Sequence, residues 1–174
     1  MARLLPVLVA LVSLLQPCFA TAEARVYIQP AEFIAAVFSD AAPQVQVLWL
    51  TPALREQTEH ILGHAPGQLR QKYWRDGQKT AWILEETGKE DLITAGFVIK
   101  DGHIEQTRVL IYRESRGGEI RLPAFLAQFR DAMLTDDNRL SRQIDGISGA
   151  TLSVNAMVRM SRLALYFAHV ANNK

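Results

Sequence analysis

The stretch from Leu69 to Tyr112, LRQKYWRDGQKTAWILEETGKEDLITAGFVIKDGHIEQTRVLIY, decides the fold. Apolar and polar residues alternate through much of it, which is the period of a half-buried β-strand. Two Asp-Gly pairs, at 76–77 and 101–102, interrupt the pattern. This dipeptide favours the type I′ turns that join antiparallel strands, because both residues tolerate a positive φ. We therefore predict an antiparallel meander of about four strands, a usual size for a sheet.

Helical patterns lie on both sides of this stretch. The elements expected before it are a helix over 30–38, a strand over 44–50, and a helix from Pro52 to about His64. After it, the segment from Pro123 to Leu134 carries apolar residues at helical spacing, namely Phe125, Leu126, Phe129 and Met133. A last amphipathic helix begins at Thr151. Helices outside a central antiparallel sheet indicate an α+β fold.

Length and composition indicate one domain. The chain has 174 residues, of which 49% are hydrophobic, and this is enough for one sizeable core. Lys and Arg total 19 against 18 Asp and Glu, and the two signs are interspersed. A protein that follows a nucleic-acid backbone needs a basic stripe, so we expect no nucleic-acid partner.

The N-terminal segment has the pattern of a secretory signal. Arg3 precedes an apolar run over 4–15, and small residues follow it. We predict a signal peptide over residues 1–22 and a single domain over 23–174, exported to the periplasm or another extracytoplasmic space. An uncleaved membrane anchor is the alternative. Cys18, the only cysteine, lies within the predicted signal, so the chemistry of the mature chain depends on oxygen and nitrogen groups or on an added cofactor.

The run Asp145-Gly146-Ile147-Ser148-Gly149-Ala150-Thr151 stands directly before the last helix. The start of a helix offers free backbone N–H groups and the positive end of the helix dipole, which together bind phosphate. The alternative is that Ser148 or Thr151 caps the helix and that Asp145 belongs to an ordinary turn. A cap does not explain Gly149 and Ala150, whose small side chains leave the backbone open to a large anion.

The same run resembles the flavinylation motif Asp-x-x-(Ser/Thr)-Gly-Ala-(Thr/Ser) of the covalent FMN-binding domain family, and every fixed position matches. This family includes the C subunit of the sodium-translocating NADH:quinone reductase and the G subunit of the Rnf complex. The resemblance implies that Thr151 carries FMN through a phosphoester and that Ser148, Gly149 and Ala150 lie in the cofactor site. It also implies that Asp145 is recognised by the attaching enzyme.

A second segment resembles the family upstream of this motif. Family members have a Glu-Thr-Pro-Gly-like loop that contributes to the flavin pocket, and Glu114-Ser115-Arg116-Gly117-Gly118 is similar. Arg116 replaces the proline, so the resemblance implies cofactor-binding roles for Glu114, Ser115 and Gly117 only. A glycine turn after a strand is the alternative for Arg116 and Gly118.

The function implied is electron transfer. We find no base, triad or metal ligand beside Thr151 that would activate its hydroxyl, so the residue is expected to be a substrate of another enzyme. By resemblance, that enzyme is a magnesium-dependent flavin transferase that uses FAD. The protein would then relay electrons between membrane or periplasmic redox proteins, such as cytochromes or quinone-linked reductases, with no substrate turnover of its own. A non-redox binding or assembly module of a membrane complex is the alternative.

A histidine group and the three tryptophans could bind a metal or a flavin, but we expect structural roles for both. Glu56, His60 and His64 fall at a helical spacing of four, and His103 could join them, but a solvated helix explains them and we predict no metal site. The three tryptophans, Trp49, Trp74 and Trp82, could stack on a flavin. Aromatic residues of sheets more often pack in a core, which is what we expect here.

Overall fold

Six strands form one antiparallel sheet in a computed structural model, which describes residues 24–173. The strand order is β1-β6-β5-β4-β3-β2, and every neighbouring pair is antiparallel. The strands are β1 (Arg25–Val26), β2 (Gln44–Trp49), β3 (Arg70–Asp76), β4 (Lys79–Thr87), β5 (Leu92–Lys100) and β6 (His103–Tyr112). The predicted four-stranded meander is confirmed as β3 to β6, and β1 and β2 extend it at its two edges.

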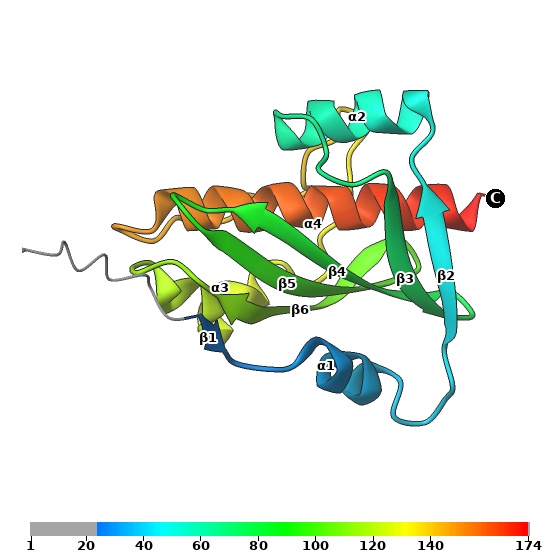
Figure 1. The fold of residues 1–174 in the computed structure, drawn as a ribbon, viewed down its shortest axis with the longest axis horizontal. Coiled ribbons are helices and arrows are strands. Elements are labelled where there is room, and N and C mark those ends of the chain that lie inside the picture. Colours follow the sequence, from blue (N-terminus) through cyan, green and yellow to red (C-terminus); the bar gives the residue numbers. More distant parts are fainter. Residues whose placement is uncertain (1–23, 174) are drawn as a thin grey trace, which may run out of the picture.

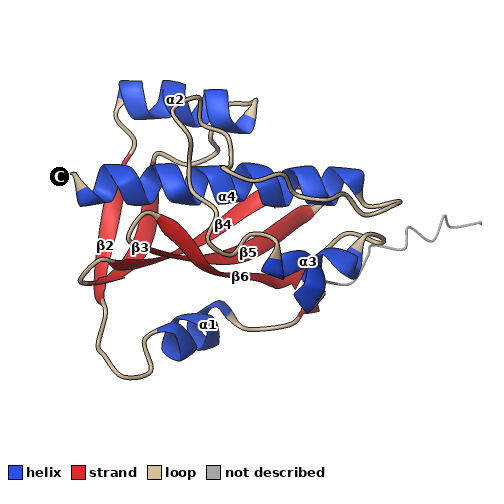
Figure 2. Cartoon of the chain, turned by 180° about the vertical axis from the view of Figure 1, so that it is seen from behind, coloured by secondary structure: helices blue, strands red, loops and turns tan. Residues whose placement is uncertain are grey.

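Helices cover both faces of the sheet (Figure 1). They are α1 (Pro30–Val37), α2 (Pro52–Leu62), the 3-10 helix η1 (Gly118–Arg121), α3 (Pro123–Ala127) and α4 (Thr151–Asn172). Helix α4 packs on β4, β5 and β6, and α2 packs on α4. Seen from behind, α1 lies on the other side of the sheet from α4 (Figure 2). The predicted α+β fold is confirmed.

The N-terminal expectation lies outside the described part of the chain. The predicted signal peptide covers residues 1–22, and the description begins at residue 24. Within residues 24–173, no helix combines the length and the apolar character needed to cross a membrane.

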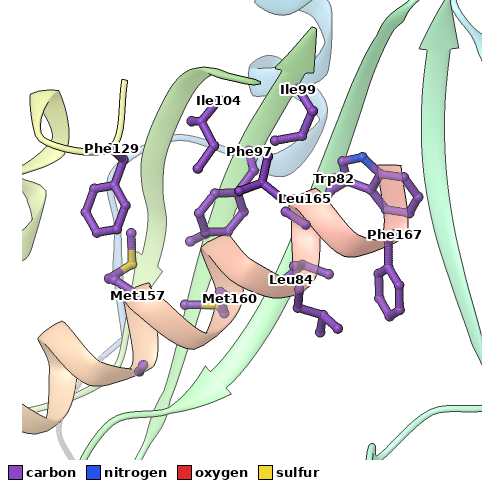
Figure 3. Packing of buried hydrophobic residues seen from close by; sticks show 14 of the residues in the cluster. Trp82, Leu84, Phe97, Ile99, Ile104, Phe129, Met157, Met160, Leu165 and Phe167 are labelled. Atoms are coloured by element: carbon purple, nitrogen blue, oxygen red, sulfur yellow. The ribbon is translucent and has the colours of Figure 1, made fainter. Parts of the chain in front are cut away.

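The main core lies between the sheet and α4 (Figure 3). Trp82 of β4 and Phe97 of β5 have no exposed surface, and both face α4. Trp82 also stacks on Tyr73, with ring centroids 4.5 Å apart. Apolar residues repeat along α4 because one broad face of the helix is buried, and Met157 and Met160 occupy its centre. This packing holds the start of α4 in a fixed place at one end of the sheet.

A smaller apolar cluster lies under α1 on the opposite face. Its centre is Phe33, which packs directly against Gly96 of β5. A Cβ atom on Gly96 would lie 2.5–2.9 Å from three carbon atoms of the Phe33 ring. Glycine is therefore required here for space, in the middle of a strand where it is otherwise unfavourable.

The two Asp-Gly pairs make different turns. Asp101 and Gly102 both have positive φ, at 51° and 80°, as a type I′ turn requires. The first hairpin instead turns on Gly77 and Gln78, and only Gly77 has a positive φ. The predicted type I′ turn is therefore wrong at this hairpin, because β3 runs one residue further and takes Asp76 into the strand.

The predicted helix from Pro123 to Leu134 is wrong beyond Ala127, where α3 ends. Asp131 has φ of 61°, which interrupts any right-handed helix. Its N–H donates to the carbonyl of Ile104 at 2.8 Å, so the chain pairs with the start of β6 instead of coiling further. Met133, expected on the buried face, is exposed as a result.

The contact between Gly96 and Phe33 predicts a measurable cost of substitution. Gly96→Ala should lower the free energy of unfolding by about 1–3 kcal/mol, the usual cost of overpacking a core. Urea unfolding measures this, and Gly146→Ala is the matched control because no atom lies within 4 Å of its added Cβ. Phe33→Leu in the Gly96→Ala background should recover part of the loss. Equal unfolding midpoints for Gly96→Ala and wild type would contradict the contact.

Candidate functional site

Helix α4 begins at Thr151, and no side chain caps it. Its N-cap residue is Ala150, which has no polar side-chain atom, so the alternative in which Ser148 or Thr151 caps the helix is wrong. The first N–H groups of a helix have no partner within the helix. The exposed residue Thr151 therefore stands beside unpaired N–H donors at the positive end of a 22-residue helix.

Gly149 gives the approach to α4 its shape. Its φ is 79°, in the left-handed region that favours glycine, and no atom lies within 4 Å of the position of a Cβ. The next residue, Ala150, is buried, and its N–H donates to the carbonyl of Ile147 at 3.0 Å. The turn is thus closed on the protein side and open on the solvent side, where Thr151 lies.

A cavity of about 640 Å³ opens in front of this turn. Its lining combines a residue of the β4–β5 turn, the loop after β6 and the start of α4: Lys89, Glu114, Ser115, Arg116, Gly149, Ala150, Thr151, Leu152 and Ser153. The structure therefore brings the two segments selected from the sequence to one site. Its volume lies within the usual range of small-molecule sites, about 300–1,000 Å³.

Glu114 holds one wall of the cavity in place. Its side chain is buried, and Oε1 accepts hydrogen bonds from the backbone N–H groups of Lys89, of Glu90 at 2.8 Å and of Asp91 at 3.1 Å. Gly88 makes room for this carboxylate, since a Cβ there would lie 2.6 Å from Oε1. Because these amides occupy Oε1, we assign Glu114 the role of positioning the turn that carries Lys89.

Gly117 supports the site from behind the cavity wall. It has φ of 85°, and an added Cβ would lie 2.9 Å from the Tyr112 hydroxyl, 3.1 Å from Ser153 Oγ and 3.2 Å from Ala150 Cβ. The Tyr112 hydroxyl donates to the carbonyl of Arg116 and lies 3.1 Å from Ser153 Oγ. Burial raises the pKa of Tyr112, so the hydroxyl keeps its proton. Tyr112 and Ser153 thus join the loop to α4.

Two residues of the motif lie outside the cavity lining. Ser148 is exposed in the turn before Gly149. Asp145 is also exposed, and its backbone N–H donates to Gln128 Oε1 at 2.7 Å. The backbone of Asp145 is therefore held by the protein while its carboxylate faces solvent, where another protein can reach it.

The cavity also contains two cationic side chains that the sequence did not single out as cofactor ligands. Lys89 and Arg116 are both exposed at its edge. Glu90 lies 2.7 Å from Lys89 Nζ, and this hydrogen bond raises the pKa of the lysine, which is positively charged at neutral pH. The Gly-Lys sequence after β4 was the available signal for Lys89. It was missed because only the fold brings this turn beside Thr151.

Comparison with known families agrees with this geometry. Residues 88–166 match the model of the FMN-binding domain. The chain carries an FMN-binding domain. This FMN-binding domain begins at Gly88 and includes every segment that lines the cavity. No curated protein matches the chain.

A second cavity, of about 660 Å³, lies where β3 and β4 separate. The two strands pair only from Tyr73 to Asp76 and from Lys79 to Trp82, and beyond these pairs the Gln71 side chain donates to the carbonyl of Ile83. The cavity wall includes Glu86, whose side chain is buried. Oε1 of Glu86 lies 3.0 Å from Arg159 Nη2 and 3.0 Å from His64 Nε2.

His64 pairs with Glu86 and lies apart from His60. Helix α2 ends at Leu62 and Gly63 has φ of 83°, so His64 leaves the helix and does not share a face with His60. Both ring nitrogens of His64 face acceptors, Nδ1 the carbonyl of Ala65 and Nε2 the Glu86 carboxylate, which favours the protonated ring. The part of the chain that the structure describes holds no group of three His, Cys, Asp or Glu placed around a metal.

The Glu114 carboxylate predicts a local effect on the β4–β5 turn. Glu114→Gln should lower the free energy of unfolding by about 1–3 kcal/mol, since hydrogen bonds to a charged acceptor are lost. Hydrogen exchange should become faster at the amides of Lys89, Glu90 and Asp91. The exposed Glu119→Gln is the matched control. Unchanged exchange at these three amides in Glu114→Gln would contradict the positioning role.

The raised pKa of His64 predicts that its contribution to the free energy of unfolding depends on pH. The Ala65 carbonyl and then the Glu86 carboxylate raise the pKa of His64, so the folded state binds the proton more tightly than the unfolded state. The stabilisation is fully present below the unfolded pKa of about 6.5 and is lost as the pH rises through the raised folded pKa. In urea unfolding, wild type and His64→Gln should differ most below about pH 6 and least near about pH 9. The exposed His60→Gln is the control, and a difference that grows with pH would contradict the assignment.

Proposed function

We propose that the protein is an exported electron-transfer flavoprotein that carries FMN covalently on Thr151. The observation that carries this proposal is the exposed Thr151 hydroxyl at the uncapped start of α4, in a cavity formed within the FMN-binding domain. A phosphoester at this hydroxyl would place phosphate oxygens at the helix N-terminus, where N–H donors and the helix dipole stabilise negative charge.

The residues present fit a phosphate-linked flavin. The open side of Gly149 allows a phosphate to approach the backbone, which a Cβ at this position would obstruct. Lys89 and Arg116 supply positive charge at the cavity edge, and Ser115 supplies a hydroxyl. When bound, FMN supplies one- and two-electron chemistry, and the protein binds and orients it.

Attachment requires a second enzyme on this proposal. Among the described residues that line the cavity, the carboxylate of Glu114 is already bonded to backbone amides and the other ionisable side chains, Lys89 and Arg116, are cations. No group is therefore placed to remove the Thr151 proton. A magnesium-dependent flavin transferase would join the Thr151 oxygen to the FMN phosphorus of FAD and release AMP and a proton. The exposed Asp145 carboxylate is proposed as its recognition point.

The cellular setting is part of the same proposal. The basic residue and the apolar run at the N-terminus support export. A covalent bond retains the cofactor outside the cytoplasm, where a dissociable one would be diluted. The partners proposed are membrane or periplasmic redox proteins, such as cytochromes or quinone-linked reductases.

Substitution at Thr151 tests the attachment site. Thr151→Val keeps the β-branched shape and removes the hydroxyl, so covalent flavin should be lost while the fold and the urea midpoint are retained. Thr151→Ser keeps a hydroxyl and should still be modified. The measurement is the intact mass of protein from cells with and without the flavin transferase. The modified chain should be heavier by FMN less one water and yellow after denaturation.

Three outcomes would contradict parts of the proposal. Covalent flavin on Thr151→Val would exclude Thr151 as the acceptor. Wild-type protein without flavin in cells that contain the transferase would favour a non-redox binding or assembly module. Complete modification of Asp145→Ala would exclude recognition through that carboxylate and leave Thr151 as the acceptor.

A further inference from the structure

One face of the sheet extends beyond the helices. Residues directly opposite each other in antiparallel strands share a face, and the register places Val45 opposite Trp74, Val47 opposite Lys72 and Trp49 opposite Arg70. We call these six residues the β2–β3 outer face. Helix α1 contacts β4 and β5 on this side, and β2 lies beyond it at the edge of the sheet (Figure 1).

Large apolar side chains on this face are open to solvent. Val45, Val47 and Trp49 of β2 are 61%, 44% and 60% exposed. Trp82 is in the core as expected, whereas Trp49 is exposed, so the expectation of core packing is wrong for Trp49. Trp74 is half-buried at the margin of the cluster under α1. A contiguous apolar surface with a tryptophan at its rim is typical of an interaction site.

The charges of this face have a single sign. Arg70 and Lys72 are exposed, and no carboxylate belongs to the six residues. The Arg70 guanidinium lies 5.8 Å from the Trp49 ring centroid, and Lys72 Nζ lies 5.4 Å from that of Trp74. These contacts hold each cation over a tryptophan, so a partner meets an apolar surface and positive charge together.

We propose that the β2–β3 outer face docks on an anionic lipid bilayer. Valine and tryptophan side chains would enter the interfacial region, where tryptophan is enriched, and Arg70 and Lys72 would meet lipid phosphates. The complementarity of charge favours this occupant, because a second copy of the chain would bring the same cations together. The bilayer would hold this face of the protein peripherally, through a pair of strands.

The β2–β3 outer face lies far from the proposed flavin site, which favours a role in attaching the protein to a bilayer. Arg75 of β3 donates to the carbonyl of Ala171 at 3.0 Å, so β3 contacts the C-terminal end of α4. Thr151 is the first residue of α4 and lies at its opposite end. A helix of 22 residues is about 33 Å long. A redox protein bound at the β2–β3 outer face would therefore stand far from Thr151. A bilayer bound there leaves the flavin site free for other partners.

Binding of the exported protein to vesicles tests the proposal. The intact mass of the protein first defines its N-terminus. The probes are phosphatidylcholine vesicles with and without phosphatidylglycerol, together with vesicles of brominated lipid that quench nearby tryptophan. We expect binding that requires phosphatidylglycerol, weakens with salt and quenches Trp49 emission. Trp82 is inaccessible, so the quenching should come from Trp49 and the half-buried Trp74. Trp49→Phe should lose much of it, and Trp49→Phe with Trp74→Phe should lose the rest. Quenching of Trp49 reports on this face whichever segment brings the protein to the vesicle.

Matched variants separate this face from general electrostatic attraction. Arg70→Gln with Lys72→Gln should weaken binding about 25-fold, since each cation near an anionic surface contributes about fivefold. Arg130→Gln with Arg142→Gln removes the same charge from exposed positions outside this face and should bind as wild type. Val45→Thr with Val47→Thr keeps β-branched residues in the strand and should also weaken binding.

Defined results would overturn the proposal. One such result is the absence of vesicle binding, and another is a Trp49 that is not quenched in bound protein. A third is equal vesicle affinity of the Arg70→Gln, Lys72→Gln variant and the Arg130→Gln, Arg142→Gln variant. A dimer without lipid that Val47→Lys dissociates would assign the face to a second copy. Binding of soluble acidic protein domains to this face, without binding of anionic vesicles, would assign it to a protein partner. Thr151→Val should bind vesicles as wild type, so failure of the flavin proposal and failure of this one are distinguishable.

Discussion

The Glu114 carboxylate is the constraint on which the candidate site depends. It lies in the loop after β6 and binds three successive backbone amides after β4, so one buried oxygen joins two segments that are more than 20 residues apart. An unpaired carboxylate at this depth would be costly, so the loop and the turn are stable only together. Lys89 reaches the cavity because this turn is held, and Gly88 is required because the carboxylate occupies the space of a side chain.

A second connection places this wall against α4. The Tyr112 hydroxyl joins the Arg116 carbonyl to Ser153, and Gly117 fits between them without room for a Cβ atom. The long buried face of α4 fixes the helix on the sheet, so its uncapped first turn is held in front of the loop. Rigid packing of the scaffold thus leaves the Thr151 hydroxyl accessible while its surroundings are fixed, as a pre-organised binding site requires.

Much of this arrangement could be predicted from local patterns, and the remainder depends on contacts distant in sequence. Alternation and turn residues were sufficient for the meander, and the last helix begins at Thr151 as predicted. The helix after Pro123 was predicted too long because only the fold shows Asp131 paired with Ile104. Lys89 was missed for the same reason, since its turn meets Thr151 only after β4, β5 and β6 assemble.

The family match and the β2–β3 outer face lie in different parts of the chain. The match covers residues 88–166, which contain the cavity and Thr151, whereas β2 and β3 lie wholly before it. Every exposed apolar residue of the β2–β3 outer face therefore lies in the part of the chain before the family match. Burial explains apolar residues in a core, but β2 exposes its valines on one face while Leu48 packs on the other. An edge strand with no charged residue and with exposed valines is a liability unless something covers it. The proposed attachment surface, far from Thr151, supplies a physical reason for retaining such a strand.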